Sequence, residues 1–316
     1  MTSLAIVVVS YNTRARTLAC LRSALAESAG VLTELVLVDN DSADGSADAV
    51  EQQLPEVTVV RSGGNLGFAR AVNLGVERSA SEYVLLLNPD TVVLPGSLRA
   101  LLEFAAANPR YGVYGGRTLR EDGSLDPSSC WGAPSLWSLT MFAVGLSTAF
   151  PGNRVLDPES LGRWRRDTVR EVPIVTGCLL LISRAHFDAV GGMDDRFFLY
   201  GEDAEFSLRA SRHGLHPVIV PSAEIIHAVG ASTGARGPKM NMVMAGKVTM
   251  LRVSWTPTRA RVGVVLLLAG ARLRALLESV TRRRDRMWTH VWRSRQKWLP
   301  GYPDAERTLF GLEVAR

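Results

Sequence analysis

The stretch Leu85-Leu86-Leu87-Asn88-Pro89-Asp90 decides the fold of this chain. A run of three leucines is typical of a parallel strand that is buried on both faces. Pro89 cannot donate to a strand ladder, so the strand ends there and Asp90 lies just past its carboxyl end. Ligands of open α/β sheets bind at that edge. A carboxylate at this point is a candidate ligand for a divalent cation and the phosphates that it carries.

Three earlier strands are predicted at residues 4–9, 35–38 and 57–60, and each is followed by polar or glycine-rich residues. Helices are predicted between them, at residues 14–29, from about residue 46, and at 66–78. This alternation predicts an α/β fold with a mostly parallel central sheet and right-handed crossovers. The polar turns would then share one edge of the sheet and face a single ligand.

Two common nucleotide signatures are absent from this half of the chain. No Gly-x-Gly-x-x-Gly turn follows the first strand, which argues against a nicotinamide or flavin enzyme. The Walker A pattern is also missing, which argues against a P-loop nucleotidase. A sugar-1-phosphate nucleotidyltransferase needs a glycine-rich, basic first turn, and Ser10-Tyr11-Asn12 is a different turn.

Composition fits a globular protein of the reducing cytosol. The 316 residues are 47% hydrophobic, which allows a sizeable core in one large or two small domains. The three cysteines, Cys20, Cys130 and Cys178, form no Cys-x-x-Cys pair, so disulfides and structural zinc are not expected. The first residues lack a basic region and a cleavage site, and are interpreted as a first strand rather than a signal peptide.

Regular patterns return after an irregular, proline-containing stretch at residues 117–170. A buried strand interrupted by Thr176-Gly177 is predicted over 172–183, a helix over 204–213, and short strands at 217–220 and 223–226, the last ending at His227. The predicted domains are a catalytic domain at 1–230 and a helical C-terminal region at 231–316. The catalytic domain would consist of a nucleotide-binding half, 1–116, and an acceptor half, 117–230.

The C-terminal region combines positive charge with an apolar run. The formal net charge is +5, and residues 259–297 hold only two acids, Glu278 and Asp285. The basic residues in that span are Arg259, Arg261, Arg272, Arg274, Arg282, Arg283, Arg284, Arg286, Arg293, Arg295 and Lys297. The apolar run 262–271 is shorter than the roughly 20 residues needed to span a bilayer. A helix lying in an anionic membrane surface fits better, although a solvated basic face remains the alternative. Nucleic acid is not an expected partner, since no groove-reading or stacking motif accompanies the arginines.

Six motifs in order along residues 4–230 resemble those of family 2 glycosyltransferases. They are Val7-Val-Val-Ser-Tyr-Asn12, Val38-Asp-Asn-Asp-Ser42, Asn65-Leu-Gly-Phe-Ala69 with Asn73, Leu87-Asn-Pro-Asp90, Thr176-Gly177 and Gly201-Glu-Asp203. The subgroup is similar to the rhamnosyltransferases of cell-wall and O-antigen assembly. The resemblance implies a Rossmann-like GT-A nucleotide-sugar domain that transfers a sugar with inversion.

The resemblance also implies roles for single residues. Asp39 would accept a hydrogen bond from the N3–H of uracil or thymine, and Tyr11 would pack on the base. Asp90 and His227 would hold a divalent cation, Mg²⁺ or Mn²⁺. Asp203 would be the catalytic base beside Glu202. The other donor-binding candidates are Ser10, Asn12, Asp41, Asn65, Gly67, Asn73 and Asn88. Asn88 departs from the family's frequent Asp-x-Asp pattern, which leaves a single acid for the cation.

Each candidate also has a structural reading that the sequence leaves open. Asp39 and Asp41 are common turn formers, and Asn65 is a good helix N-cap. Two acids at the start of a helix, as at 202–203, are favourable without any catalytic role. A single histidine such as His227 is often structural.

The expected reaction moves L-rhamnose from dTDP-rhamnose to a polyprenyl-diphosphate-linked saccharide, such as N-acetylglucosaminyl diphosphopolyprenol. It would take place at the cytoplasmic face of the cell membrane, with the protein attached peripherally. UDP-galactose or another UDP-hexose is the alternative donor. A non-catalytic scaffold that binds nucleotide or membrane is the alternative from another class. A homodimer is left open.

Overall fold

The structure is a computed structural model that describes residues 3–228, 236–281 and 286–311. The chain forms two compact units. Unit 1 comprises residues 1–131, 165–194 and 206–232, and unit 2 comprises 132–164, 195–205 and 233–316. Part of the basic span 259–297 lies outside the described residues, namely Arg282, Arg283, Arg284 and the acid Asp285. The predicted domain boundary at residue 230 also lies outside them.

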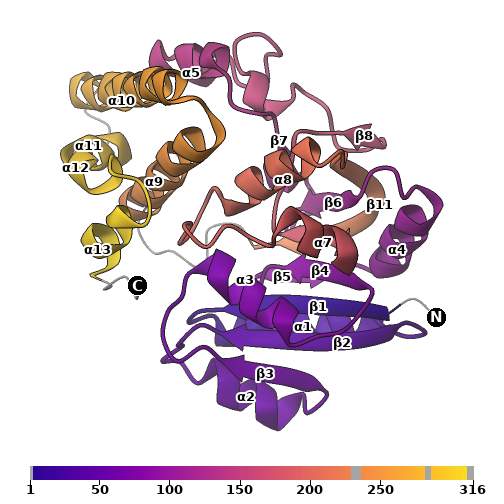
Figure 1. The fold of residues 1–316 in the computed structure, drawn as a ribbon. Coiled ribbons are helices and arrows are strands. Elements are labelled where there is room, and N and C mark those ends of the chain that lie inside the picture. Colours follow the sequence, from indigo (N-terminus) through magenta and orange to yellow (C-terminus); the bar gives the residue numbers. More distant parts are fainter. Residues whose placement is uncertain (1–2, 229–235, 282–285, 312–316) are drawn as a thin grey trace. The chain divides into compact units, whose positions relative to one another are not determined.

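Unit 1 is an α/β unit, so the predicted fold class is confirmed (Figure 1). Its first half contains β1 (Ser3–Ser10), α1 (Arg14–Glu27), β2 (Leu32–Asp39), α2 (Ser46–Gln53), β3 (Val57–Arg61), α3 (Phe68–Glu77), β4 (Tyr83–Leu87), β5 (Thr91–Val93) and α4 (Ser97–Ala107). Its second half contains β6 (Val113–Leu119), a 3₁₀ turn (Pro127–Ser129), β7 (Cys130–Trp131), β8 (Arg170–Glu171), β9 (Ile174–Val175), β10 (Leu179–Ser183), α7 (Arg184–Val190) and β11 (Val218–His227). Helix α8 (Glu202–Arg212) begins in the residues of unit 2 and ends in those of unit 1.

The central sheet has the order β3-β2-β1-β4-β10-β6-β11-β5, and β8 also pairs with β11. Strands β3, β2, β1 and β4 are parallel, as the alternating pattern predicts. Beyond β4 the sheet becomes mixed, because β10 runs antiparallel to both β4 and β6. The carboxyl ends of the first four strands share one edge, which places the loops after Ser10, Asp39 and Leu87 together.

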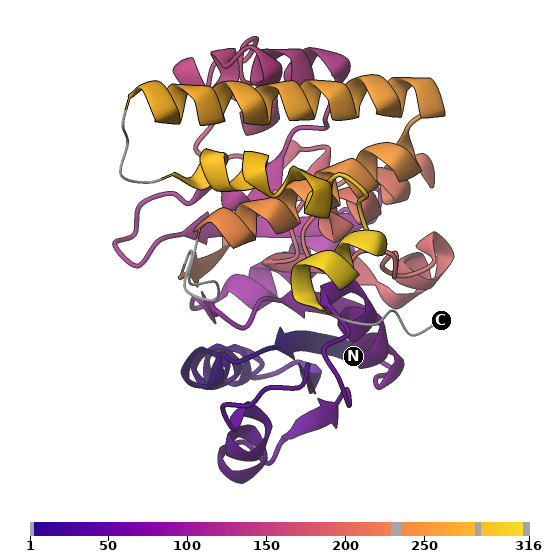
Figure 2. The ribbon, with the colours of Figure 1, turned by 90° about the vertical axis from the view of Figure 1, so that its left-hand side faces the viewer.

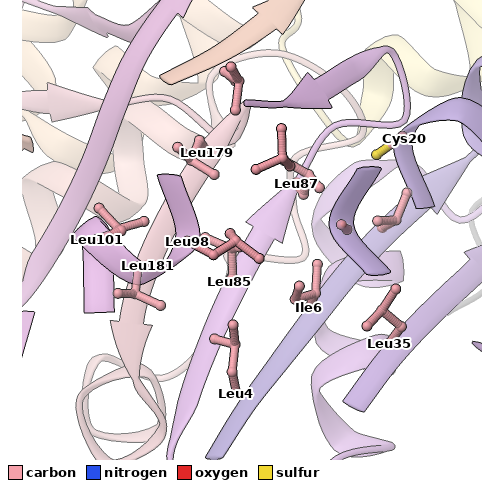
Figure 3. Close-up of a cluster of buried hydrophobic side chains, with 14 of the residues drawn as sticks. Leu4, Ile6, Cys20, Leu35, Leu85, Leu87, Leu98, Leu101, Leu179 and Leu181 are labelled. Atoms are coloured by element: carbon pink, nitrogen blue, oxygen red, sulfur yellow. The ribbon is translucent and has the colours of Figure 1, made fainter. Parts of the chain in front are cut away.

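The strand β4 is continuously buried because it lies between β1 and β10 and is covered on both faces. Leu85, Leu86 and Leu87 are at most 1% exposed. In Figure 3, Leu85 packs with Leu4 of β1 and Leu181 of β10 under helix α4. Burial of each such side chain stabilises the fold by about 1.5–3 kcal/mol. The triple leucine therefore fixes β4 at the centre of the sheet.

Two features of the sheet differ from the sequence predictions. The two short strands predicted at 217–220 and 223–226 are one strand, β11, whose register against β6 shifts between Val220 and Glu224. Pro221 lies at that shift, and it has no N–H to continue the ladder. The strand predicted over 172–183 is divided at Thr176-Gly177, as predicted, but its two parts lie in different sheets: β9 pairs with β7, and β10 lies in the central sheet.

Unit 2 is mainly helical. It contains α5 (Leu136–Ala143), α6 (Leu146–Ala149), a 3₁₀ turn (Pro158–Ser160), α9 (Arg236–Ser254), α10 (Pro257–Val280), α11 (Met287–Arg293), α12 (Arg295–Trp298) and α13 (Asp304–Phe310). Figure 2 shows α10 as a long straight helix flanked by α5 and α11. Arg274 of α10 stacks on Phe142 of α5 and donates a hydrogen bond to its carbonyl oxygen. Among the described residues, no helix has the length and apolar character required to cross a membrane.

Candidate active site

Asp39 lies at the carboxyl edge of the parallel strands, where it is the last residue of β2. It pairs in register with Ser10 of β1 and Arg61 of β3. Its side chain is buried, and its Oδ2 accepts a hydrogen bond from the Ser42 N–H at 3.1 Å. Its Oδ1 is also buried and has no hydrogen-bond partner in the described part of the chain. A buried carboxylate oxygen without a donor is costly, so this position suits a ligand that donates one.

Asn40 joins the Asp39 loop to the turn before α3. Its Nδ2 donates to Asn65 Oδ1 at 2.9 Å and to the Gly67 carbonyl at 3.2 Å, and its Oδ1 accepts from the Leu66 N–H at 2.8 Å. Asn65 Oδ1 also accepts from the Gly67 N–H at 3.1 Å. Asn65 and Gly67 are therefore held beside β2, and α3 begins two residues later than predicted. The sequence motif contained Asn40, but no role was predicted for it.

The loops after β1 and β2 are also connected to each other. Asn12 Oδ1 accepts from the Ala43 N–H at 2.8 Å, and the Asn12 N–H donates to Ser42 Oγ at 3.0 Å. Asn12 and Asp41 adopt left-handed backbone conformations, which asparagine and aspartate tolerate well. The Tyr11 side chain is 48% exposed between these bonded loops, so its ring is accessible to a ligand.

Two of the predicted donor-binding residues have structural contacts instead. The Ser10 hydroxyl is fully buried and bonds to the hydroxyls of Thr13 and Thr17. The Asn73 amide exchanges two hydrogen bonds with the backbone of Met193, at 2.8 and 2.9 Å. Both side chains therefore connect neighbouring segments of unit 1.

Strand pairing brings His227 to Asp90. Thr91 of β5 pairs antiparallel with His227, and the Ala228 N–H donates to the Asp90 carbonyl at 3.0 Å. As a result His227 Nε2 lies 3.4 Å from Asp90 Oδ1. On the other side of the ring, His227 Nδ1 lies 3.1 Å from Asp126 Oδ2. Asp126 was not predicted, because it lies in the irregular stretch where neither periodicity nor a motif marks it.

The two carboxylates control the protonation of His227. Burial lowers the pKa of this imidazole, but hydrogen bonds to Asp126 and Asp90 outweigh burial and raise it to about 12. Burial raises the pKa of Asp126, yet hydrogen bonds from His227 and Ser128 bring it below its ordinary value. The two carboxylates therefore favour the protonated form of the His227 imidazole. Metal binding at Nε2 would release a proton.

The chemistry of this pair fits a divalent cation that arrives with a diphosphate. Within the residues that the structure describes, no group of three or more His, Cys, Asp or Glu side chains could hold a metal ion. Asp90 and His227 instead offer one oxygen and one nitrogen. Mg²⁺ sites commonly use one or two carboxylates and take the remaining ligands from water and substrate phosphates. The side-chain amide nitrogen of Asn88 donates a hydrogen bond to Cys178 Sγ at 3.3 Å, so this nitrogen does not supply a third ligand.

The acidic pair Glu202-Asp203 begins helix α8, after a turn in which Tyr200 and Gly201 have positive φ angles of 67° and 105°. Glu202 is 5% exposed, and its Oε2 has no hydrogen-bond partner among the described residues. Burial first, and the neighbouring charge of Asp203 second, raise the pKa of Glu202 to about 8. Glu202 therefore keeps its proton at neutral pH. The adjacent Asp203 accepts a hydrogen bond from the Ala204 N–H at 2.8 Å.

The turn before the acidic pair packs directly on α9 and on the C-terminal helices of unit 2. A Cβ atom on Gly246 of α9 would lie 1.7 Å from the Tyr200 carbonyl oxygen, so only glycine permits this contact. The Tyr302 hydroxyl donates to the Leu199 carbonyl at 3.0 Å. The Phe198 ring packs against Phe310, with ring centroids 4.4 Å apart. Segments on both sides of the predicted boundary at residue 230 are thus in contact within unit 2.

Sequence comparisons place these features in a known family. The model of "Glycosyl transferase family 2" matches residues 5–168, and that of the "N-terminal domain of galactosyltransferase" matches residues 167–231. The chain is 35% identical over 228 residues to an N-acetylglucosaminyl-diphospho-decaprenol L-rhamnosyltransferase of Mycobacterium tuberculosis, covering 69% of this chain and 73% of that protein. It is 24% identical over 230 residues to the low-salt glycan biosynthesis hexosyltransferase Agl10 of Haloferax volcanii, covering 72% of this chain and 66% of that protein.

Solved structures share the fold. The mannosyltransferase PcManGT from Pyrobaculum calidifontis, solved in complex with GDP-Man and Mn²⁺, has a TM-score of 0.57 at 16% identity, covering 98% of this chain and 88% of that one. GalNAc-T7, solved with UDP, GalNAc and Mn²⁺, has a TM-score of 0.57 at 15% identity, covering 80% of this chain and 48% of that one. These likenesses confirm the predicted GT-A fold.

Proposed function

Since the chain belongs to glycosyl transferase family 2 and is a glycosyltransferase, we propose that it transfers L-rhamnose from dTDP-rhamnose to a polyprenyl-diphosphate-linked saccharide. The Mycobacterium tuberculosis relative, named for rhamnosyl transfer to a decaprenyl-linked acceptor, supports this choice. The observation in the structure that carries the proposal is the unpartnered Oδ1 of Asp39. Thymine and uracil each offer an N3–H that can donate to this oxygen.

The donor would bind along the carboxyl edge of β1, β2 and β4. Asp39 accepts from the base, and the exposed Tyr11 ring packs on it. The backbone N–H groups at the start of α3, presented by the Asn65–Gly67 turn, face the sugar or phosphate groups. The two bonded loops that contain Asn12 and Asp41 would close the base pocket on the side of β1.

Asp90 and His227 would hold Mg²⁺ or Mn²⁺ together with the donor diphosphate, as the two related structures solved with Mn²⁺ suggest. When bound, the cation neutralises the charge that develops on the leaving diphosphate. Asp126 holds the ring of His227 through Nδ1, and this leaves Nε2 directed at Asp90.

Asp203 would act as the general base. The acceptor hydroxyl attacks the anomeric carbon, its proton passes to the Asp203 carboxylate, and the bond to the nucleoside diphosphate breaks with inversion. The adjacent Glu202 is less suited to this role, because burial and the charge of Asp203 raise its pKa to about 8.

We place the enzyme peripherally at the inner face of the cell membrane, where a polyprenyl-linked acceptor would meet it. The basic residues of the C-terminal region support this placement. A second candidate function is transfer of galactose or another hexose from a UDP-sugar. The match of residues 167–231 to the galactosyltransferase model favours that alternative.

Thermal unfolding with a panel of nucleotides tests the donor assignment. We expect dTDP and UDP to raise Tm, more strongly with Mn²⁺ than without it, and GDP and NAD to have little effect. Asp39→Asn should remove the response to dTDP, whereas the matched variant Asp188→Asn, at an exposed position of α7, should keep it. Stabilisation by NAD alone would overturn the proposal.

A further inference from the structure

One face of helix α10 combines exposed aliphatic side chains with arginines and has no acid. The α10 outer face consists of Arg261, Val262, Val265, Arg272, Leu276 and Val280. These positions recur at intervals of one, three, four or seven residues, which places them on one side of a helix. All six are exposed, and Val265 and Val280 reach 63% and 80%. The opposite side of the helix is buried at Ala260, Gly263, Leu267, Ala271 and Arg274.

The buried side of α10 is fully occupied by its neighbours within unit 2. A Cβ atom on Gly270 would lie 2.4 Å from the Phe142 ring of α5, and one on Gly263 would lie 3.0 Å from Leu251 of α9. The outer face points away from these contacts. Scattered exposed aliphatic residues are ordinary, but four of them on one face of a helix, interleaved with arginines, indicate an interaction surface.

A basic groove adjoins the outer face. It has a volume of about 350 Å³ and lies between α10 and α11, lined by Arg272, Leu276 and Ser279 on one side and by Thr289, Trp292 and Arg293 on the other. The guanidinium groups of Arg272 and Arg295 lie 5.6 and 4.6 Å from the centre of the Trp292 ring. Neither Arg272 nor Arg293 has a carboxylate partner within the described ranges. The groove therefore offers two arginines that have no carboxylate partner among the described residues, next to an indole ring and the hydroxyls of Ser279 and Thr289.

From this arrangement we propose that the α10 outer face and the groove form a docking site for an anionic phospholipid bilayer. The aliphatic side chains enter the boundary between headgroups and acyl chains, as amphipathic surface helices do. Arg272 and Arg293 bind the phosphate of a lipid headgroup in the groove, and Trp292 lies at the interface. The biological purpose of this docking site rests on the proposed function. The inference adds the particular residues that attach the protein to the membrane.

Charge complementarity selects a lipid surface over other occupants. An apolar protein partner would cover the aliphatic stripe but would bury Arg261 and Arg272 without counter-ions. At an anionic bilayer, long arginine side chains reach the phosphates while the aliphatic residues between them lose contact with water. A second copy of this chain would bring identical positive charges together, which disfavours a symmetric pairing of this face.

Vesicle sedimentation without donor or acceptor tests the docking site independently of catalysis. Wild-type protein should bind vesicles of phosphatidylcholine with phosphatidylglycerol, bind pure phosphatidylcholine weakly, and dissociate as salt is raised. Each basic residue near an anionic surface contributes about fivefold to binding. Arg272→Ala/Arg293→Ala should therefore bind roughly 25-fold more weakly. The matched control Arg99→Ala/Arg212→Ala removes two exposed arginines of unit 1 and should bind normally.

A second variant distinguishes a loss of vesicle binding from a failure to fold. Val265→Asp alters an exposed position, should leave Tm unchanged, and should also weaken vesicle binding. Both variants should retain transfer to a detergent-dispersed acceptor, so loss of docking is separable from failure of the enzyme. Unchanged vesicle binding in both variants would overturn the proposal. A protein dimer that Val265→Asp converts to a monomer would also overturn it, by assigning the face to a second copy.

Discussion

The strand-end edge of unit 1 and the acidic turn of unit 2 position their polar groups by different means. At the edge, sheet topology is sufficient, because Asp39 ends β2 and the pairing of β5 with β11 sets Asp90 beside His227. The acidic turn has no strand to hold it. It depends on close backbone packing against α9 and on contacts with the C-terminal helices. Sites of the first kind can be located from strand patterns, whereas sites of the second kind need the tertiary structure.

The largest expected effect is on catalysis in unit 2. Asp203→Asn removes the proposed base, and a general base contributes about 10²–10⁴-fold. Transfer should fall about 10³-fold, while dTDP affinity, which we assign to unit 1, should stay near the wild-type value. Steady-state rates and calorimetric titration of dTDP measure the two quantities. The control Glu103→Gln, at an exposed position of α4, should affect neither. Retained transfer in Asp203→Asn would remove Asp203 from the base role.

The packing of the acidic turn predicts a large effect from one methyl group. Gly246→Ala would place Cβ 1.7 Å from the Tyr200 carbonyl oxygen, so the turn or α9 must move. We expect a loss of about 3 kcal/mol in the free energy of unfolding, with transfer reduced in the protein that remains folded. Gly64→Ala is the control, because its Cβ meets nothing within 4 Å. Equal urea midpoints for the two variants would contradict this packing.

Protonation of Glu202 predicts a pH effect of defined sign. Its pKa is raised from 4.5 to about 8 on folding, so the folded state retains a proton that the unfolded state loses. The contribution of Glu202 to stability therefore falls as pH rises from about 4.5 to 8, by on the order of a few kcal/mol. Glu202→Gln keeps a neutral side chain and should be more stable than wild type at pH 8 but not at pH 4.5. Urea unfolding at both pH values measures this, and a constant difference between the proteins would count against a buried, protonated Glu202.

The smallest effect concerns the support of His227 in unit 1. Asp126→Asn weakens the hydrogen bond to Nδ1, and loss of such an outer-shell carboxylate typically costs 10–100-fold in metal affinity. We expect weaker Mn²⁺ binding in the presence of dTDP, measured by electron paramagnetic resonance. Asp122→Asn lies in the same loop without contacting His227 and is the matched control. If both variants bind Mn²⁺ equally, Asp126 has no role in the site.

The same contrast explains how much the sequence could predict. Continuous apolar runs such as 85–87 located the parallel strands, and the polar residues after them located Asp39 and Asp90. The motifs placed Glu202 and Asp203 at a helix start, and the structure has α8 beginning there. Ser10 and Asn73 fitted the motifs equally well, yet their side chains bond to Thr17 and to the Met193 backbone. A motif gives a residue's position, while only packing decides which way its side chain points.

Other features left no pattern in the sequence. Asp126 reaches His227 from 101 residues away, through a loop without periodicity. Strand β10 lies between β4 and β6 and runs antiparallel to both. Its direction cannot be predicted from the sequence, because a strand buried on both faces has the same apolar run whether it is parallel or antiparallel. The contact between Gly246 and Tyr200 is likewise specified only by the fold, because an isolated glycine in a helix has many explanations.

The most direct test of the central claim is a donor screen read by mass spectrometry. Purified protein, Mn²⁺ and N-acetylglucosaminyl diphosphopolyprenol would be incubated with dTDP-rhamnose, UDP-galactose, UDP-glucose or GDP-mannose in parallel. We predict that only dTDP-rhamnose extends the acceptor, by one deoxyhexose, and that Asp203→Asn forms this product about 10³-fold more slowly. Extension by a hexose from a UDP-sugar, with none from dTDP-rhamnose, would contradict the account of the donor.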